Sequence, residues 1–220
     1  ITLVREPVAR TISDVFQNLN FSIPHINDLD ENNAFKLISA YIIEQFKKFD
    51  EKKDYICTWF DKEIKDVFNL DIYALKFSKR DGFQIFKAEN VDILLIKLEK
   101  LSECHQQAFQ DFLNIRNFQL KIANVGSQKP YKGLYNNILD SISIPDDCLD
   151  RVYTSRFARH FYTPEEIQLF KRRWLGQTTA GTLADLNADV PKISSSALSI
   201  DKDKDSRRLF HFNPACEFNH

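Results

Sequence analysis

Methionine is absent from the 220 residues of the sequence. A complete translated chain begins with methionine, whereas the first residues here, Ile1–Val4, already have the apolar pattern of a β-strand. Because complete chains rarely begin inside a buried strand, we expect the sequence to be a fragment of a longer protein.

Cysteine is scarce and dispersed. The sequence has four cysteines, which form no C-x-x-C pair: Cys57, Cys104, Cys148 and Cys216. This spacing excludes a zinc ribbon and a dithiol redox motif, so we expect free, mostly buried thiols in a reducing compartment. His211, Cys216 and His220 are too weakly patterned to predict a metal site, and we expect no metal.

The sequence also lacks a charge excess and a long apolar run. Its 30 basic and 31 acidic residues leave a net charge of -1, which argues against nonspecific nucleic-acid binding. No apolar run reaches the length of a transmembrane helix, and no signal peptide is present. We therefore expect a cytoplasmic protein without a transmembrane segment or a nucleic-acid partner.

Apolar residues make up 43% of the sequence, including 19 phenylalanines, which is enough for a sizeable core. The length suits one domain, and we place it at residues 1–176. Residues 177–220 are expected to form a tail or extended arm. The stretch 177–208 is rich in Thr, Ser, Ala and Asp, and it offers few large side chains to offset the entropy of ordering.

Several short apolar runs predict β-strands. Ile1–Val4 and Val91–Leu98 end in polar residues and lead into helical patterns, so we expect them side by side in one parallel sheet. Leu70–Phe77 and Phe83–Lys87 have the pattern of two strands joined by a short turn. Phe118–Ile122 is a further short candidate.

Apolar residues at helical spacing predict that most of the remaining chain is helical. The expected helices are Pro7–Leu19, Asn32–Phe49, Tyr55–Phe68, Glu103–Leu113, Tyr131–Ser141, Asp146–Phe161 and Pro164–Trp174. The last has a clear start, with Thr163 as N-cap, proline at the first position and Glu166 at the third.

The segment around the first turn carries the chemistry. Arg5 lies where the first strand ends, and Ser13 lies two turns into the next helix. A guanidinium there can grip a phosphate through two parallel hydrogen bonds, a hydroxyl can add a third, and the helix start supplies backbone donors. Arg10 either supports this pocket or pairs with Glu6 across one turn. The alternative is an ordinary strand-turn-helix with an exposed arginine.

Arg5-x-Pro7 followed by Ser13 resembles the 3′-phosphate-binding motif of sulfotransferases. Leu98–Leu101 is similar to a strand end found in many of these enzymes. Further segments resemble a bacterial family of capsular polysaccharide synthesis proteins: 59–64, 124–135, 153–162, 165–167 and Trp174. The resemblance covers residues 1–174 and leaves the tail unmatched.

The resemblance implies an α/β fold: a three-layer parallel sheet of the P-loop-like, nucleoside-phosphate-binding sulfotransferase type, with a largely helical C-terminal half. Arg5 and Ser13 would hold the 3′-phosphate of 3′-phosphoadenosine 5′-phosphosulfate (PAPS). Sulfotransferases also have a phosphosulfate loop with a lysine or arginine upstream of this motif, and the sequence does not contain it. The resemblance assigns no catalytic base to this sequence.

Two further groups are candidates for ligand contacts. Lys129 and Tyr131 follow a Gly-Ser loop, where the tyrosine can stack on adenine and the lysine can meet a phosphate, unless both are simply solvated. His160 and Tyr162, with two arginines on the preceding turn, face an anionic acceptor or pack as structural residues.

The resemblance implies a PAPS-dependent sulfotransferase that transfers a sulfuryl group to a hydroxyl of a saccharide. Its partners would be the nucleotide donor PAPS and a saccharide acceptor, and no metal is expected. The alternative is a noncatalytic binding or assembly subunit of a polysaccharide machine with the same fold.

Overall fold

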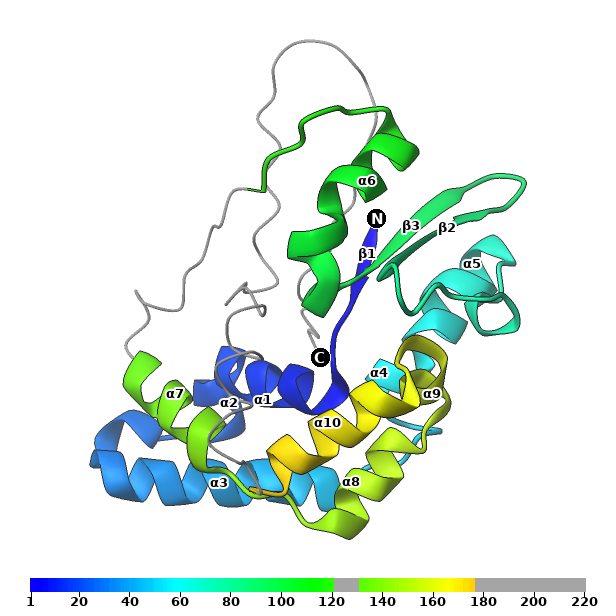
Figure 1. Cartoon of the computed structure of the whole chain (residues 1–220). Helices are drawn as coiled ribbons and strands as arrows, with labels where there is room; N and C mark the ends of the chain where they lie inside the picture. The colour runs from blue at the N-terminus through cyan, green and yellow to red at the C-terminus, as the bar shows by residue number, and fades with distance from the viewer. Residues whose placement is uncertain (121–130, 177–220) are drawn as a thin grey trace.

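The computed structural model describes residues 1–120 and 131–176 (Figure 1). Several sequence predictions concern residues outside these ranges: Lys129, the end of the candidate strand at 121–122, the tail 177–220, and the chain-end residues His211, Cys216 and His220.

A small mixed sheet joins the N-terminal strand to a hairpin from the middle of the chain. It contains β1 (Thr2–Val4), β2 (Phe83–Lys87) and β3 (Asp92–Lys97) in the order β1-β3-β2. β1 runs parallel to β3, and β2 runs antiparallel to it. The prediction that the first strand lies beside Val91–Leu98 in a parallel arrangement is confirmed.

The prediction of an all-parallel sheet is wrong for the described residues, because β2 pairs with β3 in an antiparallel direction. Helices make up most of the described structure. Leu70–Phe77 is not a strand but holds a 3₁₀ turn, η3 (Ile72–Ala74). The reason is local, because the Asp71 carboxylate accepts the backbone N–H groups of Tyr73 and Ala74 and stabilises the turn. Residues 118–120 are also irregular.

The helices follow the predicted order. They are α1 (Pro7–Gln17), α2 (Leu19–Ser22), α3 (Glu31–Lys47), α4 (Tyr55–Trp59), α5 (Asp66–Phe68), α6 (Leu101–Leu113), α7 (Lys132–Ser141), α8 (Asp146–Tyr153), α9 (Arg156–Phe161) and α10 (Pro164–Trp174). The shorter turns are η1 (Ile26–Asp28), η4 (Leu98–Lys100) and η2 (Phe60–Lys65), the last a π-helical stretch between α4 and α5.

One predicted helix is divided in the structure, and the predicted start of another is confirmed. The predicted helix Asp146–Phe161 is divided between α8 and α9, because the Ser155 side chain accepts the N–H of Ala158 and starts a new helix. The start of α10 is confirmed: Thr163 and Glu166 form a reciprocal capping box.

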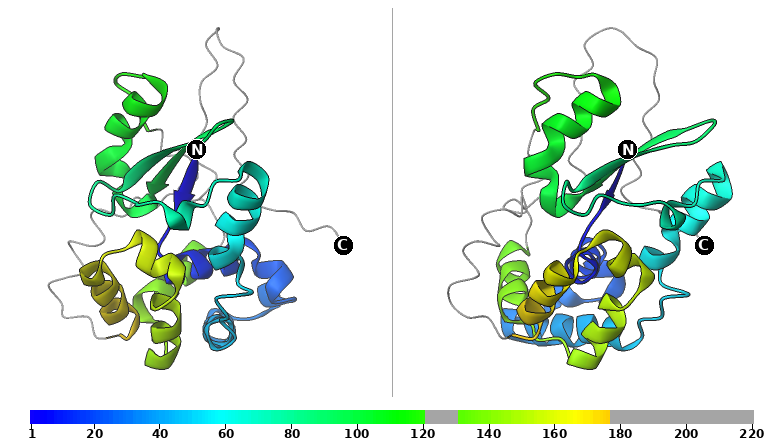
Figure 2. Two further views of the ribbon diagram at one scale, coloured as in Figure 1. Left: turned by 90° about the vertical axis from the view of Figure 1, so that its right-hand side faces the viewer. Right: turned by 45° about the vertical axis from the view of Figure 1, so that its right-hand side comes forward.

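Helices cover both faces of the sheet. Alternate residues of β3 point to opposite faces, as the pleat requires. Leu94 and Ile96 pack with α6, whereas Ile93 and Leu95 pack toward α4 and α9. In Figures 1 and 2, α6 stands apart from the other helices, with the sheet between. β3 is therefore a buried strand, which explains its nearly continuous apolar sequence.

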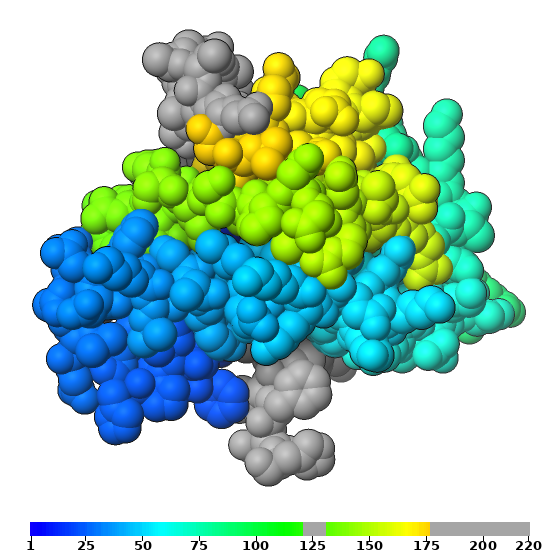
Figure 3. Space-filling view, turned by 90° about the horizontal axis from the view of Figure 1, so that it is seen from below, coloured from blue at the N-terminus to red at the C-terminus, as the bar shows by residue number. Residues whose placement is uncertain are grey.

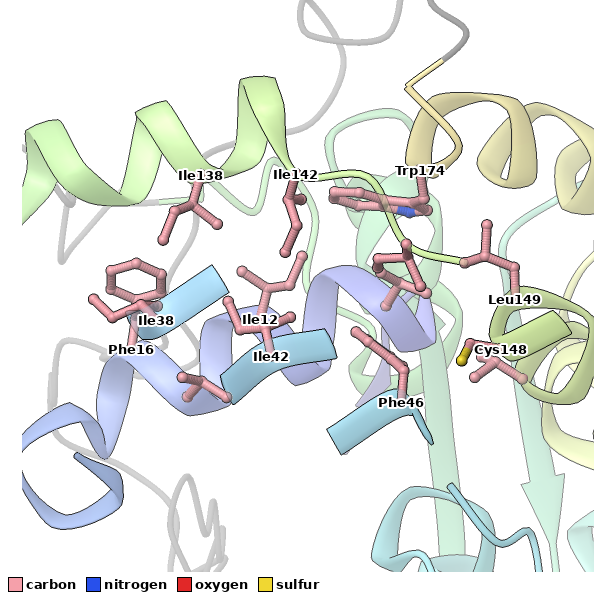
Figure 4. Packing of buried hydrophobic residues seen from close by; sticks show 14 of the residues in the cluster. Ile12, Phe16, Ile38, Ile42, Phe46, Ile138, Ile142, Cys148, Leu149 and Trp174 are labelled. Carbon is pink, nitrogen blue, oxygen red and sulfur yellow. The ribbon is translucent and has the colours of Figure 1, made fainter. Parts of the chain in front are cut away.

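The second part of the molecule is an apolar centre formed by α1, α3, α7, α8 and α10 (Figure 4). Ile12, Ile38, Ile42, Ile138 and Trp174 are at most 1% exposed there. Figure 3 shows α3 running alongside α7 and α8, and both pairs are in contact. We call this cluster the apolar centre.

The described residues confirm part of the cysteine prediction, because Cys57, Cys104 and Cys148 are buried free thiols. Within the same residues, no three His, Cys, Asp or Glu side chains are arranged to hold a metal ion. None of the described helices is long and apolar enough to cross a membrane.

Candidate functional site

The carboxyl ends of β1 and β3 lie at one edge of the sheet, because the two strands are parallel. In Figure 1 this edge faces α1 and α10. Six polar side chains meet beside it: Glu6, Lys97, Glu99, Tyr153, Tyr162 and Glu166. We call this group the strand-end junction.

Glu6 is the most buried carboxylate of the junction, at 3% exposure. It caps α1: its two oxygens accept the backbone N–H groups of Val8 at 2.8 Å and Ala9 at 2.7 Å. The hydroxyl of Tyr153 and the indole Nε1 of Trp174 donate to the same carboxylate. Burial raises the pKa of Glu6, and these donors oppose that shift.

The capping by Glu6 changes two expectations about the start of α1. The amides of Val8 and Ala9, which were expected to help bind a phosphate, already donate to Glu6. The donors to the Glu6 carboxylate come from the start of its own helix, from α8 and from α10. The predicted alternative, a pair between the side chains of Glu6 and Arg10, is therefore not formed.

Glu99 extends the junction across the two strand ends. One carboxylate oxygen accepts the backbone N–H of Glu6, and the other accepts the Tyr162 hydroxyl at 3.2 Å. Burial raises the pKa of Glu99, the nearby Glu6 carboxylate raises it further, and Arg5 opposes the shift. Arg5 therefore lies within electrostatic reach of Glu99.

Lys97 is fully buried at the end of β3. Its ammonium forms an ion pair with Glu166 of α10 and donates to the carbonyl of Lys79 at 3.3 Å. It also lies 4.7 Å from the centroid of the Tyr162 ring. The ammonium thus has an anion, a carbonyl and a ring face around it, as a buried charge requires.

The predicted phosphate residues lie beside this junction. Arg5 follows β1 directly, and Arg10 and Ser13 lie three residues apart on α1, hence on neighbouring positions of one helix side. Burial lowers the pKa of Arg10; Asp14 opposes the shift and the charge of Arg5 adds to it. Neither guanidinium forms a hydrogen bond or ion pair within residues 1–120 and 131–176. Two cations so placed can attract an anion.

The Tyr131 side chain contacts α1 farther along that helix. Tyr131 immediately precedes α7, and its ring centroid is 5.6 Å from that of Phe16, one turn beyond Ser13. Arg5 and Arg10 therefore lie within electrostatic reach of each other near the start of α1, Ser13 lies about one turn beyond Arg10, and Tyr131 packs toward the helix end.

The predicted grouping of His160 with Tyr162 is not formed. The Tyr162 hydroxyl points to Glu99, whereas the His160 ring packs against other aromatic rings. These are Tyr73, Phe77 and Phe161. Burial lowers the pKa of His160 to about 4, with Lys79 and Arg156 lowering it further. This environment favours the structural alternative for His160.

Sequence reasoning missed most of the junction. A signal was present for Glu6, since a proline at the first helical position places the preceding residue at the N-cap. Lys97 was visible as a charge closing an apolar run, but nothing marked it as buried. Tyr153 had no local signal, because its partner Glu6 is 147 residues away in the chain.

Comparison with family models identifies a relationship over the middle of the chain. Residues 26–163 match the model of the NKWYS family, which is described as "putative capsular polysaccharide synthesis protein". The matched range contains Glu99, Tyr153 and Tyr162, but not Arg5, Arg10 and Ser13. No curated protein and no solved structure matches the chain.

Proposed function

The chain belongs to the family of capsular polysaccharide synthesis proteins. We propose that it is a PAPS-dependent sulfotransferase acting on a hydroxyl of a saccharide. The saccharide acceptor accords with the polysaccharide named in the family description. The donor is proposed from the residues at the start of α1 and from their resemblance to the 3′-phosphate motif of sulfotransferases.

The observation that carries the proposal is the placement of Arg5, Arg10 and Ser13. Arg5 follows a parallel strand, and ligands of α/β folds collect outside the carboxyl ends of such strands. Arg10 and Ser13 lie on one side of the helix that follows. Two guanidinium groups and a hydroxyl match the needs of a phosphate, which accepts several charge-assisted hydrogen bonds.

In the proposed reaction, the acceptor hydroxyl attacks sulfur and forms a new O–S bond. The bond between sulfur and the phosphate oxygen of PAPS breaks, and 3′-phosphoadenosine 5′-phosphate leaves with the electron pair. The hydroxyl proton passes to a base or to solvent. Arg5 and Ser13 anchor the 3′-phosphate and so position the donor, and positioning is a large part of the catalysis of group transfer.

Calorimetric titration of the full-length protein with 3′-phosphoadenosine 5′-phosphate tests the proposal. Arg5→Ala should weaken binding by about 1.5–3 kcal/mol, the range for a hydrogen bond to a charged group, or about tenfold to more than a hundredfold. Ser13→Ala should cost less, because a neutral hydroxyl supplies one donor and no charge. Adenosine 5′-phosphosulfate lacks the 3′-phosphate, so neither variant should alter its binding.

Arg116→Ala is the matched control. Arg116 is exposed and lies just beyond the far end of α6, which leads away from the strand ends over its 13 residues. Its replacement should leave both nucleotides unaffected. Equal losses for the two nucleotides in Arg5→Ala, with an unchanged circular dichroism spectrum, would remove Arg5 from the site and contradict the proposal.

One observation favours the second candidate, a noncatalytic binding or assembly subunit. The two amides at the start of α1 donate to Glu6, so an anion beside Arg5 does not gain these backbone donors. This candidate predicts that the full-length protein binds an acidic saccharide but neither 3′-phosphoadenosine 5′-phosphate nor PAPS. The same calorimetric experiment separates the two functions.

A further inference from the structure

Arg5 lies in the two-residue connection between β1 and α1, and the Glu6 carbonyl of this connection accepts the N–H of Arg10 at 2.9 Å. The pairing of β1 with β3 ends at Val4 opposite Lys97, and α1 begins at Pro7. Proline has no N–H, so it cannot add a backbone bond at this point. The N–H of Glu6, in contrast, is held by a side chain.

Glu99 supplies such a bond. Its carboxylate oxygen accepts the N–H of Glu6, which belongs to the peptide that joins Arg5 to Glu6. This bond fixes the plane of that peptide, and with it the direction in which the Arg5 side chain leaves the backbone. Glu99 reaches the connection from η4, which directly follows β3, so the two strand ends are tied together beyond the last ladder pair.

Glu99 is itself held by a buried tyrosine. The Tyr162 hydroxyl donates to its second oxygen at 3.2 Å, and the Tyr162 ring is 1% exposed. That ring packs edge-on against Phe170, with 5.4 Å between the ring centroids, and its centroid lies 4.7 Å from the Lys97 ammonium. A carboxylate held in this way has little freedom to turn, so it can hold the peptide after Arg5 in one orientation.

We propose that Glu99 is a positioning residue for Arg5: it orients the arginine for the anion by holding the peptide that follows it, and it does not itself touch the anion. This inference rests on the proposed function, since it assigns a role within the same phosphate site. It goes beyond that function by placing a carboxylate, which repels phosphate, among the residues on which phosphate binding depends.

The sign of the effect separates positioning from charge alone. Glu99→Gln keeps an oxygen that accepts the Glu6 N–H and removes the charge, so 3′-phosphoadenosine 5′-phosphate should bind within about threefold of wild type or more tightly. Glu99→Ala removes both the acceptor oxygen and the charge. Arg5 is then no longer held in one orientation, so binding of 3′-phosphoadenosine 5′-phosphate should weaken about tenfold. If Glu99 acted only by its charge, both variants would bind the anion more tightly.

A double-mutant cycle with Arg5→Ala makes the test specific. Glu99→Ala should cost almost nothing once Arg5 is absent, because the residue acts through Arg5. Glu103→Ala serves as control, since Glu103 is an exposed neighbour on α6 that pairs with Lys100, and it should leave binding unchanged. If Glu99→Ala does not fold, Tyr162→Phe replaces it in the cycle. Tyr162→Phe should weaken nucleotide binding about threefold, and it should have no effect in a protein that already carries Arg5→Ala.

The outcomes are distinguishable. A wild-type protein that does not bind 3′-phosphoadenosine 5′-phosphate overturns the proposed function together with this inference. Wild-type binding with additive losses in the cycle, or with equal losses in Glu99→Gln and Glu99→Ala, overturns the inference and leaves the phosphate site standing. Coupled losses, rescued by glutamine, support it.

Discussion

The apolar centre and the strand-end junction meet at α10 and are built from opposite chemistry. In the apolar centre, Ile12, Ile38 and Ile42 are fully buried without a polar atom in their side chains. In the junction, Glu6 and Lys97 are equally buried, and each is surrounded by specific partners. Trp174 belongs to both, since its ring packs in the apolar centre and its indole N–H donates to Glu6.

The two regions should differ in how well they tolerate substitutions. An apolar core accepts replacements that conserve volume, because dispersion and burial have no strict direction. A buried polar group is stable only while its partners remain, and removing one leaves the others unpaired. We therefore expect the junction to be the more sensitive region, although the apolar centre has more buried residues.

The largest expected effect is at Glu6. Glu6→Ala leaves Tyr153, Trp174 and two amides of α1 without their acceptor, so the free energy of unfolding should fall by about 3–5 kcal/mol. Urea denaturation followed by circular dichroism measures the loss. Glu63→Ala, at an exposed position of η2, should change stability by less than about 0.5 kcal/mol. A loss below about 1 kcal/mol in Glu6→Ala would show that the junction adapts as easily as a surface.

The matching change in the apolar centre is at Ile42. Ile42→Ala should lower the free energy of unfolding by about 2–4 kcal/mol, and Ile42→Val by about 1 kcal/mol, because the cost follows the volume removed. Leu37 lies on the same helix and is 43% exposed, so Leu37→Ala should lower the free energy of unfolding by well under half of the Ile42→Ala loss. If Ile42→Val cost as much as Ile42→Ala, the tolerance assigned to this region would be wrong.

The two regions also differ in how far the sequence predicts them. The buried face of α3 follows from helical spacing, because Ile38, Ile42 and Phe46 lie four residues apart and periodicity is a local property. The junction depends on pairs that are distant in the chain: Glu6 and Trp174 are 168 residues apart, and Glu99 and Tyr162 are 63 apart. No local pattern encodes such pairs.

The sheet and the candidate site show the same limit. The apolar runs identified β1 and β3 correctly, but the Asp71 turn replaced a predicted strand through bonds that a propensity pattern does not contain. Arg5 and Ser13 were found from a short motif, and their role in binding stays a prediction. The motif did not reveal that Glu6 takes the helix amides expected to serve a phosphate.

The third expected effect is at His160, whose ring is only partly exposed. The Nε2 atom of His160 is buried and has no hydrogen bond within residues 1–120 and 131–176, and burial lowers its pKa to about 4. The folded state therefore binds fewer protons than the unfolded state, whose histidine has a pKa near 6.5. Stability should be complete above about pH 6.5 and fall as the pH decreases toward 4. The partial exposure of the ring limits the loss to about 1–2 kcal/mol.

Denaturation midpoints between pH 4 and 7 test this dependence. His160→Phe keeps an aromatic ring in the cluster and removes the titrating group, so it should flatten this part of the pH profile. His25→Asn is the control, because His25 is exposed and pairs with Asp28 at the surface, and it should leave the profile as in wild type. A His160→Phe profile that keeps the wild-type slope would assign the acid sensitivity to other groups.

The smallest expected effect lies at the start of α10, the helix that serves both regions. Glu166 caps this helix with one oxygen and pairs with Lys97 through the other, while Trp174 at the far end fills the apolar centre. Thr163→Ala removes the hydroxyl that accepts the N–H of Glu166, so unfolding should become easier by about 1 kcal/mol. Thr163→Ser keeps that acceptor and should lose much less. Because Glu166 keeps the N–H of residue 163 and its ion pair in both variants, a Thr163→Ala loss of 3 kcal/mol or more would mean that the cap also holds the junction.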